Sequence, residues 1–418
     1  MQFILNKKID NISEAFYLMA RWFGIILIFG ITWSHAFFNI GIYGLFLCII
    51  LSPSRYSELL RALNNRISLV AVILFSYIAL GLLYTSASFD IALAEVMMYK
   101  KLLIIPVLIM LYKDGNWTSR VLFSYSLGAF ILIIPTILDG TGILKLLALD
   151  LSKIKDGSYT NLSLVYWRNH IINGFHTSIL FTICILISLK FKKYSLIFLF
   201  IASTCLLDII LFINGRLALA SIIAACLLLI FKKLKNNNSK YIFALLLLLL
   251  LSFIYNQSSS IRNRVESVAT EATLFYKEKN INTSGGERLF YWGMSLDLFF
   301  KNPILGSGPG SFRQNLLSSD NPLHTEPHKH AHNEYLTLLS QNGLIGLFLF
   351  SYLTIIIFKK NHESNNELVK DIIQLGLFLF LLNALTDSSL NNESEGWTFV
   401  LFASIVNFSS PNKYEIIT

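Results

Sequence analysis

Residues 332–358 read HNEYLTLLSQNGLIGLFLFSYLTIIIF, and this stretch decides the fold. It opens with polar residues, becomes predominantly apolar at Leu336 and stays so to Phe358. A run near the roughly 20 residues needed to cross a bilayer predicts a transmembrane helix that is entered from a polar loop. His332 would lie at the mouth of this helix, where a histidine can exchange a proton near neutral pH.

The whole chain has the composition of a polytopic membrane protein. Of its 418 residues, 54% are hydrophobic and 14% are charged, and the mean hydropathy of +0.59 is too high for one soluble core. Apolar runs near spanning length recur at residues 17–35, 36–51, 66–84, 97–112, 119–138, 171–189, 194–213, 217–231, 241–255, 336–358, 371–386 and 396–408. The sequence therefore predicts an all-α fold with about twelve transmembrane helices.

Basic residues indicate the orientation, because short cytoplasmic loops are enriched in Lys and Arg. They gather in every second connection, at Lys7 and Lys8, Arg55 to Arg66, Lys113 and Arg120, Lys190 to Lys193, Lys232 to Lys240, and Lys359 to Lys370. The intervening short loops, such as residues 85–95 and 387–395, are neutral or acidic. We therefore expect both termini in the cytoplasm and His332 on the exported side.

Charge and cysteine content exclude several classes of function. The net charge of +9 follows from this topology, so nucleic-acid binding is not implied. No cleavable signal peptide is expected, because no small-residue cleavage site follows a short apolar region. All four cysteines fall inside predicted spans, so neither a disulfide nor a cysteine-based metal site is expected.

The predicted organisation has three parts. Residues 1–255 would form nine spans with short loops and an exported segment at 139–170, and residues 256–335 would form one large exported loop. Residues 336–418 would form the last three spans and a cytoplasmic C-terminus. Within the large loop, residues 261–276 predict an amphipathic helix, and residues 287–300 predict a second helix that ends before Pro303.

Two arginines are candidate anion ligands. Arg216 follows Asn214-Gly215 at an exported turn, where a cation is a functional candidate but can equally be an interfacial side chain that reaches lipid headgroups. Arg288 is predicted in the first turn of the second loop helix, where backbone amides also favour an anion. A solvated ion pair with Glu287 is the alternative.

Histidines cluster at the end of the large loop, at His324, His328, His330 and His332. Alternating histidines can bind zinc or copper, but no cysteine and no closely spaced acid beyond Glu326 and Glu334 completes such a site, so we expect no metal. His332 differs because a helix begins next to it. The helix N-terminus would disfavour the imidazolium form and keep the ring able to accept a proton. A loop histidine without chemical function is the alternative.

Gly306-Ser-Gly308-Pro-Gly310 resembles a nucleotide-binding loop only superficially, since no strand precedes it. We interpret it as a flexible turn, or as a nest of amides near an anion.

Taken together, these motifs resemble the O-antigen ligase and polymerase superfamily of bacterial envelopes. The residues that carry the resemblance are Asn302-Pro-Ile-Leu-Gly-Ser-Gly-Pro-Gly-Ser-Phe312, the spacing from His332-Asn333 to Gly346, Arg288 in a large exported loop, and Arg216 in Asn-Gly-Arg. The predicted span layout matches as well, and the chain is most similar to the O-antigen ligases of Gram-negative inner membranes.

The resemblance implies en bloc transfer of a glycan from undecaprenyl diphosphate to an outer sugar of lipid A-core, by a metal-independent, inverting, GT-C-type glycosyltransferase on the periplasmic side. His332 would be the base that deprotonates the acceptor hydroxyl, and Arg216 and Arg288 would bind the diphosphate. No cofactor is implied. Preorganised cations would stabilise the departing diphosphate, and a general base would activate a weak nucleophile.

Five further residues are candidates for acceptor binding or support. Tyr291 and Trp292 could be sugar platforms, although aromatic residues at interfacial depth are common without such a role. Arg313 could attract the phosphates of lipid A-core. Asn333 and His330 flank His332.

Two alternatives remain open. An O-antigen polymerase or a protein O-oligosaccharyltransferase of the same superfamily would share the donor site and the base, and would differ in the acceptor. A transporter or flippase of a lipid-linked anion would instead require inverted repeats and broken helices at mid-membrane. Neither feature is clear in the sequence, and the candidate residues lie on one side of the predicted membrane.

Overall fold

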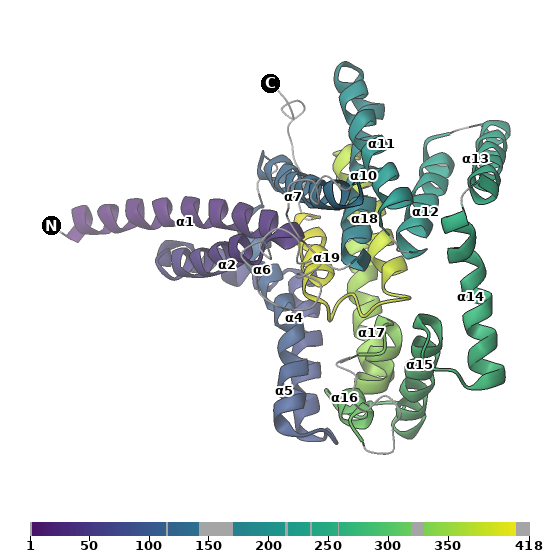
Figure 1. Ribbon diagram of the computed structural model, residues 1–418. Helices are drawn as coiled ribbons and strands as arrows, with labels where there is room; N and C mark the ends of the chain where they lie inside the picture. The colour runs from purple at the N-terminus through teal and green to yellow at the C-terminus, as the bar shows by residue number, and fades with distance from the viewer. Residues whose placement is uncertain are drawn as a thin grey trace.

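A computed structural model of the chain describes residues 2–113, 116–141, 170–213, 216–234, 236–257, 259–318 and 330–406. All regular structure in these ranges is helical, which confirms the all-α prediction. Figure 1 shows the helices gathered into one bundle, with α1 and α2 side by side at one edge and α13 and α14 at the other.

The helices of the first half are α1 (Gln2–Trp33), α2 (His35–Ile50), η1 (Pro53–Arg55), α3 (Tyr56–Leu63), α4 (Arg66–Leu80), η2 (Gly81–Leu83), α5 (Phe89–Met98), η3 (Tyr99–Ile104), α6 (Ile105–Leu111), α7 (Asn116–Gly140) and α10 (His170–Lys190). The second half contains η5 (Lys192–Tyr194), α11 (Ser195–Leu211), α12 (Arg216–Lys233), α13 (Asn237–Gln257), α14 (Ser259–Glu278), α15 (Ser284–Lys301), α16 (Ser311–Leu316), α17 (Glu334–His362), α18 (Glu367–Asn383) and α19 (Glu393–Ile405).

Six helices of the described chain are long and apolar enough to cross a membrane, and a bent pair, His35–Ile50 with Pro53–Leu63, could add a seventh. The chain thus has the helix composition of a multi-pass membrane protein. The count of about twelve stays a prediction, because several expected spans correspond to shorter helices. The expected spans 36–51, 371–386 and 396–408 fall on α2, α18 and α19, which have 16, 17 and 13 residues.

The prediction of one continuous span at 97–112 is wrong. The segment consists of the end of α5, the 3₁₀ helix η3 and the short helix α6. Pro106 lies in the first turn of α6, where it lacks the amide that would continue a helix. Lys101 lies in η3 and is buried, and its ammonium group reaches main-chain carbonyls almost 300 residues further along the chain.

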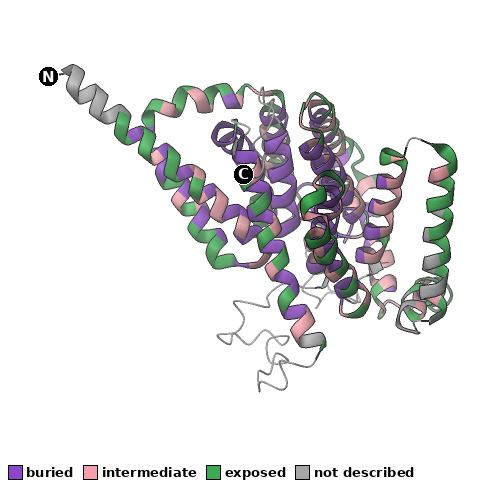
Figure 2. Ribbon diagram, turned by 90° about the horizontal axis from the view of Figure 1, so that it is seen from above, coloured by how far each residue is buried: buried purple, intermediate pink, exposed green. Residues whose placement is uncertain are grey.

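The core lies at the centre of the bundle, where Figure 2 shows buried residues on several adjoining helices. Helix α19 is almost wholly buried, from Ser394 to Ile405. Its neighbours include α6, α18 and η3. The segment that precedes α19, residues 384–392, is therefore held between elements from distant parts of the chain.

Both helices predicted in the large loop are confirmed. The predicted helix 261–276 is α14, and 287–300 is α15, which begins after Thr283, whose hydroxyl accepts the N–H of Gly286, and ends at Asn302. Of the other segment predicted to be exported, residues 142–169 lie outside the described ranges. His324 and His328 lie outside them too.

Candidate active site

Helix α17 is broken at Gly343, and the break brings together two motifs of the sequence. Gly343 has φ 63° and ψ −165° inside the helix, a combination that is essentially restricted to glycine. A Cβ atom there would lie 2.2 Å from the carbonyl oxygen of Ile304 and 2.6 Å from the amide nitrogen of Gly306. The loop of residues 302–310 therefore passes directly against the break.

This loop takes over hydrogen bonds that an unbroken helix would make with itself. The amides of Leu344 and Ile345 donate to the carbonyls of Pro303 and Ile304, at 2.9 and 3.4 Å. In return, the amides of Ser307 and Gly308 donate to the carbonyls of Ser340 and Gln341, both at 2.9 Å. Because an α-helix pairs each amide with the carbonyl four residues earlier, residues 340 and 341 have exchanged their helical partners for the loop.

The interpretation of Gly306-Ser-Gly308-Pro-Gly310 as an anion nest is therefore wrong. Its three glycines do have positive φ angles, of 76°, 87° and 77°, but their amides are engaged. That of Gly306 donates to Asn302, that of Gly308 to the Gln341 carbonyl, and that of Gly310 to the Gln341 side chain. The glycine-rich loop serves to dock α15 and α16 onto α17.

His332 lies immediately before the other end of this helix. Asn333 caps α17 by accepting the amide of Leu336 at 3.0 Å, and its side-chain nitrogen donates to the carbonyl of Leu385 at 2.9 Å. His332 itself has φ 49°, a left-handed conformation that is uncommon for residues other than glycine and that clusters at functional sites. Asn333 thus belongs to the frame that fixes the His332 backbone.

Two aromatic rings border the imidazole of His332. The ring of Tyr291 is stacked on it at a centroid distance of 6.2 Å, and the ring of His330 meets it edge-on at 4.8 Å. The Tyr291 hydroxyl donates to Glu287 at 2.8 Å, and Tyr291 is fully buried. The structure therefore places Tyr291 and His330 at His332, where Tyr291 is a packing partner more than an open sugar platform.

Asp387 is the acidic partner of His332. Its carboxylate lies 3.2 Å from Nδ1 of the imidazole and also accepts the amide of Ser388. Burial alone would raise the pKa of this carboxyl, but the His332 hydrogen bond and the charges of His330 and His332 outweigh burial and hold the pKa below its usual value. The group is therefore a carboxylate at neutral pH.

Sequence reasoning missed Asp387. The chain did contain a signal, because Asp387 opens the acidic connection 387–395, which was predicted on the same side of the membrane as His332. However, His332 and Asp387 are 55 residues apart in the sequence, so their pairing produces no local sequence motif. Asp387 also places a negative charge beside His332, which the sequence-based expectation did not include.

Glu334 fixes the loop that carries Asp387. Its backbone amide donates to the carbonyls of Ala384 and Asp387, at 2.9 and 3.1 Å. Its carboxylate, which is fully buried, accepts the amides of Leu390 and Asn391 at 2.8 and 3.2 Å. The residue two positions after His332 thus binds both ends of the segment on which Asp387 lies.

Lys101 holds the same segment from its other side. The ammonium group donates to the carbonyls of Leu390, Asn391 and Asn392 at 3.1, 3.1 and 2.5 Å, and the residue is 3% exposed. Lys101 therefore binds the carbonyls of residues 390–392, and Glu334 binds the amides of Leu390 and Asn391. Charge-assisted hydrogen bonds of this kind are short and strong.

Arg288 lies on α15, one helical turn before Tyr291. Since residues three apart are neighbours on a helix surface, Arg288 lies beside the residue that stacks on His332. The expectation of a free helix N-terminus at Arg288 is wrong in one respect. Helix α15 begins at Ser284, and two amides of its first turn are already used, that of Gly285 by the Glu271 carboxylate at 2.6 Å and that of Gly286 by the Thr283 hydroxyl at 3.0 Å.

Arg216 is the first residue of α12, and its side chain, with Asn214 and Gly215, lies outside the described part of the structure. Asp208, which precedes this turn on α11, is fully buried and accepts the hydroxyl of Thr136 at 2.6 Å. The proposed convergence of Arg216 and Arg288 therefore stays a prediction.

The two remaining candidates are half-buried. Arg313 lies on the short helix α16, next to Phe312, whose ring contacts Tyr291 at 5.8 Å. Trp292 follows Tyr291 on α15, and its indole N–H has no hydrogen-bond partner among the described residues. Both residues thus lie on elements that border the site, and their role in acceptor binding stays a prediction.

His330, His332 and Asp387 offer possible metal ligands within 4.8 Å of one another. The donor set of two imidazoles and one carboxylate suits zinc in principle. The same three groups also form a histidine base with an acidic partner, which needs no metal. The expectation of a metal-independent site stays a prediction, which chelation can test.

Comparison with known proteins agrees with this geometry. Residues 201–351 match a protein-family model described as O-Antigen ligase, which confirms the resemblance drawn from the motifs. The match includes Arg216, Arg288, His332 and Gly343, whereas Asp387 lies beyond it. A search of curated proteins finds no match to the chain.

Proposed function

We propose that this chain, which carries an O-antigen ligase family region at residues 201–351, transfers a polysaccharide en bloc from undecaprenyl diphosphate to an outer sugar of lipid A-core. The observation that supports this most directly is the pair formed by His332 and Asp387 at the start of α17. The enzyme is a multi-pass protein of the bacterial inner membrane, with cytoplasmic termini and a periplasmic site.

His332 acts as the general base. When Nδ1–H donates to the Asp387 carboxylate, Nε2 carries the lone pair that accepts the proton of the acceptor hydroxyl. The positive charge that this transfer creates on the ring is stabilised by Asp387 at 3.2 Å, in the way that a buried carboxylate assists a catalytic histidine elsewhere. General-base help of this kind typically contributes about 100- to 10,000-fold to the rate.

The transfer itself needs one bond formed and one bond broken. The acceptor oxygen attacks the anomeric carbon from the face opposite the diphosphate, the sugar–phosphate bond breaks, and the diphosphate leaves with the electron pair. The sugar carbon is thereby inverted. Arg288 and Arg216 stabilise the charge that develops on the diphosphate, because a guanidinium fork binds phosphate oxygens in pairs. Loss of one such preorganised donor typically costs about 3–4 kcal/mol of transition-state stabilisation.

Buried contacts of Glu334 and Lys101 hold the His332–Asp387 pair in a fixed position. Asp387 lies on a segment that Glu334 and Lys101 bind from opposite sides. His332 precedes Glu334 by two residues, so the base and its partner share one rigid frame. A fixed pair of this kind supports catalysis because its orientation is set before substrate binds.

The test uses the full-length protein in detergent with undecaprenyl-diphosphate-linked glycan and lipid A-core, for wild type and for His332→Ala. We expect wild type to form glycan-bearing lipid A-core and the variant to lose this activity. Elongation of the lipid-linked glycan without modification of lipid A-core would instead identify a polymerase. Absence of any covalent product in detergent, with movement of the donor across the membrane after reconstitution into vesicles, would identify a transporter.

A further inference from the structure

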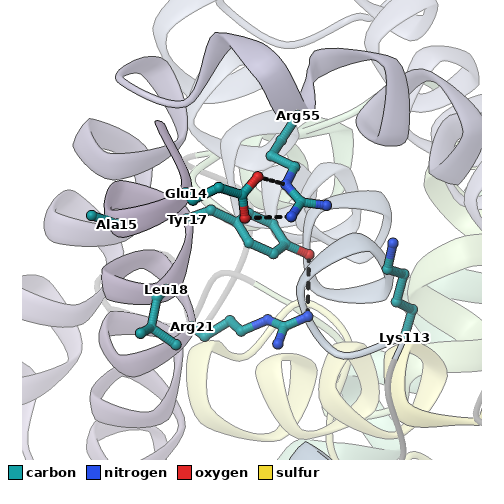
Figure 3. Close-up of a pocket in the computed structure, with 7 residues that line it drawn as sticks. All are labelled: Glu14, Ala15, Tyr17, Leu18, Arg21, Arg55 and Lys113. Carbon is teal, nitrogen blue, oxygen red and sulfur yellow. Dashed lines mark hydrogen bonds and ion pairs between the residues drawn. The ribbon is translucent and has the colours of Figure 1, made fainter. Parts of the chain in front are cut away.

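A cavity of about 550 Å³ lies between residues 14–21 of α1, Arg55 at the turn η1 and Lys113 after α6. Figure 3 shows its lining, in which Arg21, Arg55 and Lys113 face the same space as Glu14. Three of the lining side chains are cationic and one is acidic, and with Glu58, which binds Arg55 and Lys113 from outside the lining, the local net charge is +1. Such a cavity favours an anion.

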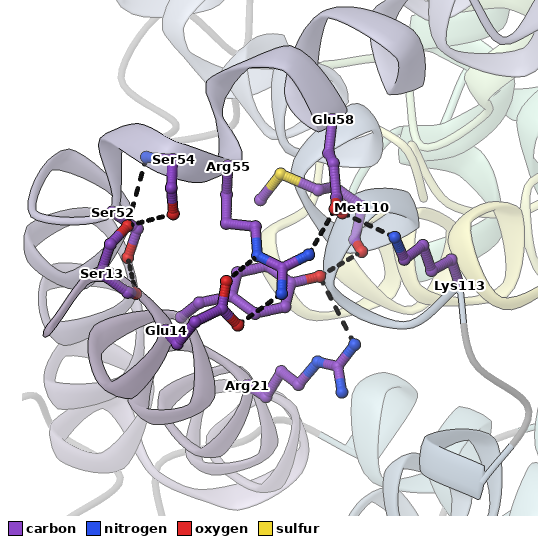
Figure 4. Close-up of polar contacts among 10 residues, drawn as sticks. Ser13, Glu14, Arg21, Ser52, Ser54, Arg55, Glu58, Met110 and Lys113 are labelled. Atoms are coloured by element: carbon purple, nitrogen blue, oxygen red, sulfur yellow. Dashed lines mark hydrogen bonds and ion pairs between the residues drawn. The ribbon is translucent and has the colours of Figure 1, made fainter. Parts of the chain in front are cut away.

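Two of these cations are fixed by carboxylates. Arg55 binds Glu14 through both its Nε and Nη2 atoms and binds Glu58 through Nη1, and Lys113 donates to the other oxygen of Glu58 at 2.6 Å (Figure 4). Both cations stay partly exposed, with 26% and 47% of the side-chain surface accessible. They are therefore held in place and still open to a ligand.

Aromatic rings position Arg21. Its guanidinium lies 4.9 Å from the ring centre of Tyr17 and 5.2 Å from that of Trp117. Tyr17 is itself fixed, because it is buried and its hydroxyl donates to the carbonyl of Met110 at 2.8 Å. Cation–π contacts of this type orient an arginine without neutralising its charge.

The surroundings match a membrane interface on the side that the sequence assigns to the cytoplasm. Trp22 and Trp117 pack edge to face at 5.4 Å, and Arg120 lies over both rings. Tryptophan is enriched at the level of lipid headgroups. Leu18 lines the cavity, and it is 50% exposed. An apolar surface therefore continues along α1 from the basic cavity, through Leu18 to Trp22.

We propose that this cavity binds the phosphate headgroup of an anionic phospholipid, whose acyl chains lie along the exposed apolar face of α1. The cations supply the charge, the aromatic residues set the depth, and Leu18 provides the first contact for a chain. A soluble phosphate would use the cations but not the apolar surface. Basic pockets between helices on the cytoplasmic side are a recurrent form of headgroup site. The inference is independent of the glycan-transfer chemistry.

The test is native mass spectrometry of the full-length protein, released from nanodiscs that contain equal amounts of phosphatidylglycerol and phosphatidylcholine. We expect wild type to retain phosphatidylglycerol preferentially. The double variant Arg21→Gln/Lys113→Gln should bind it about thirtyfold more weakly, from the loss of two charges near the headgroup. The matched control, Lys192→Gln/Lys193→Gln, removes the same charge from the exposed turn η5 and should bind like wild type.

A second variant separates a binding defect from a folding defect. Leu18→Asp keeps every cation but places a negative charge on the apolar face of α1 that is proposed to contact the acyl chains. It should therefore also lose the lipid. Its unfolding temperature in lipid-free detergent should stay at the wild-type value. Equal retention of both lipids by wild type, or unchanged binding by the double variant, would overturn the proposal. Displacement of the lipid by inorganic phosphate alone would overturn it too, because the site would then serve a soluble anion.

Discussion

Replacing Gly343 with alanine should separate the glycine-rich loop from helix α17. The new Cβ would lie 2.2 Å from the carbonyl oxygen of Ile304 and 2.5 Å from its carbon, distances that no real Cβ atom tolerates. These are main-chain atoms, so a simple rotamer change cannot relieve the clash. Either the loop of residues 302–310 moves away, or the break in α17 changes its conformation.

The cost can be worked from the structure. The backbone conformation of Gly343, φ 63° and ψ −165°, costs a residue with a side chain about 1–3 kcal/mol. Moving the loop removes the hydrogen bonds of Leu344, Ser307 and Gly308 across the junction, each worth about 0.5–1.5 kcal/mol. Together these effects should destabilise the protein by about 2.5–7.5 kcal/mol, a large share of a typical folding free energy.

The assay is the free energy of unfolding from denaturant titration in detergent, paired with the rate of glycan transfer. Gly293→Ala is a matched control, because Gly293 lies inside α15 and no atom of the described residues lies within 4 Å of the place that a Cβ would take. There, alanine should stabilise the helix by about 0.5–1 kcal/mol and leave transfer unchanged. Wild-type stability in Gly343→Ala, or equal losses in both variants, would refute the loop exchange as the reason for this glycine.

The site supports three further predictions. Lys101→Met should destabilise the protein by about 3–5 kcal/mol and increase hydrogen exchange at the Leu390 amide, whereas Lys100→Met, at an exposed neighbour, should change neither. Arg288→Gln should lower the transfer rate by about 100- to 1,000-fold with partial recovery in Arg288→Lys, and equal rates for wild type and Arg288→Gln would exclude a role at the diphosphate. Because the pKa of Asp387 is lowered, its stabilising charge is complete above about pH 4 and is lost only as pH falls through that lower value. The free energy of unfolding should therefore lose this contribution only below about pH 4, and its loss near neutral pH would contradict the pairing of Asp387 with His332.

The sequence predicted the helical architecture because composition and hydrophobic period are local properties. The amphipathic run at 261–276 and the Asn302-Pro303 stop were sufficient to place α14 and the end of α15. The segment 97–112 was mispredicted because it is equally apolar. Its 3₁₀ helix η3 contains Lys101, which binds carbonyls from the far end of the chain, and such a contact leaves no trace in the hydropathy of the segment itself.

The site was predicted in part. His332 was identified from its place before an apolar helix. The glycine loop was left open between a flexible turn and an anion nest, because a sequence does not show whether the amides of such a loop are free or already bonded. Only the fold shows that Ser340 and Gln341 accept those amides. Asp387 was missed because the sequence around an acid that follows a predicted span does not show which distant histidine it contacts.

The most direct test of the account is a double-mutant cycle of glycan transfer in EDTA, with His332→Ala, Asp387→Asn and the combined variant beside wild type. If Asp387 acts through His332, wild type stays active without free metal and each single variant loses activity. Adding Asp387→Asn to His332→Ala then has little further effect, because residues that act as one unit are not additive. Loss of wild-type activity in EDTA, or fully additive losses in the double variant, would contradict the metal-independent base pair.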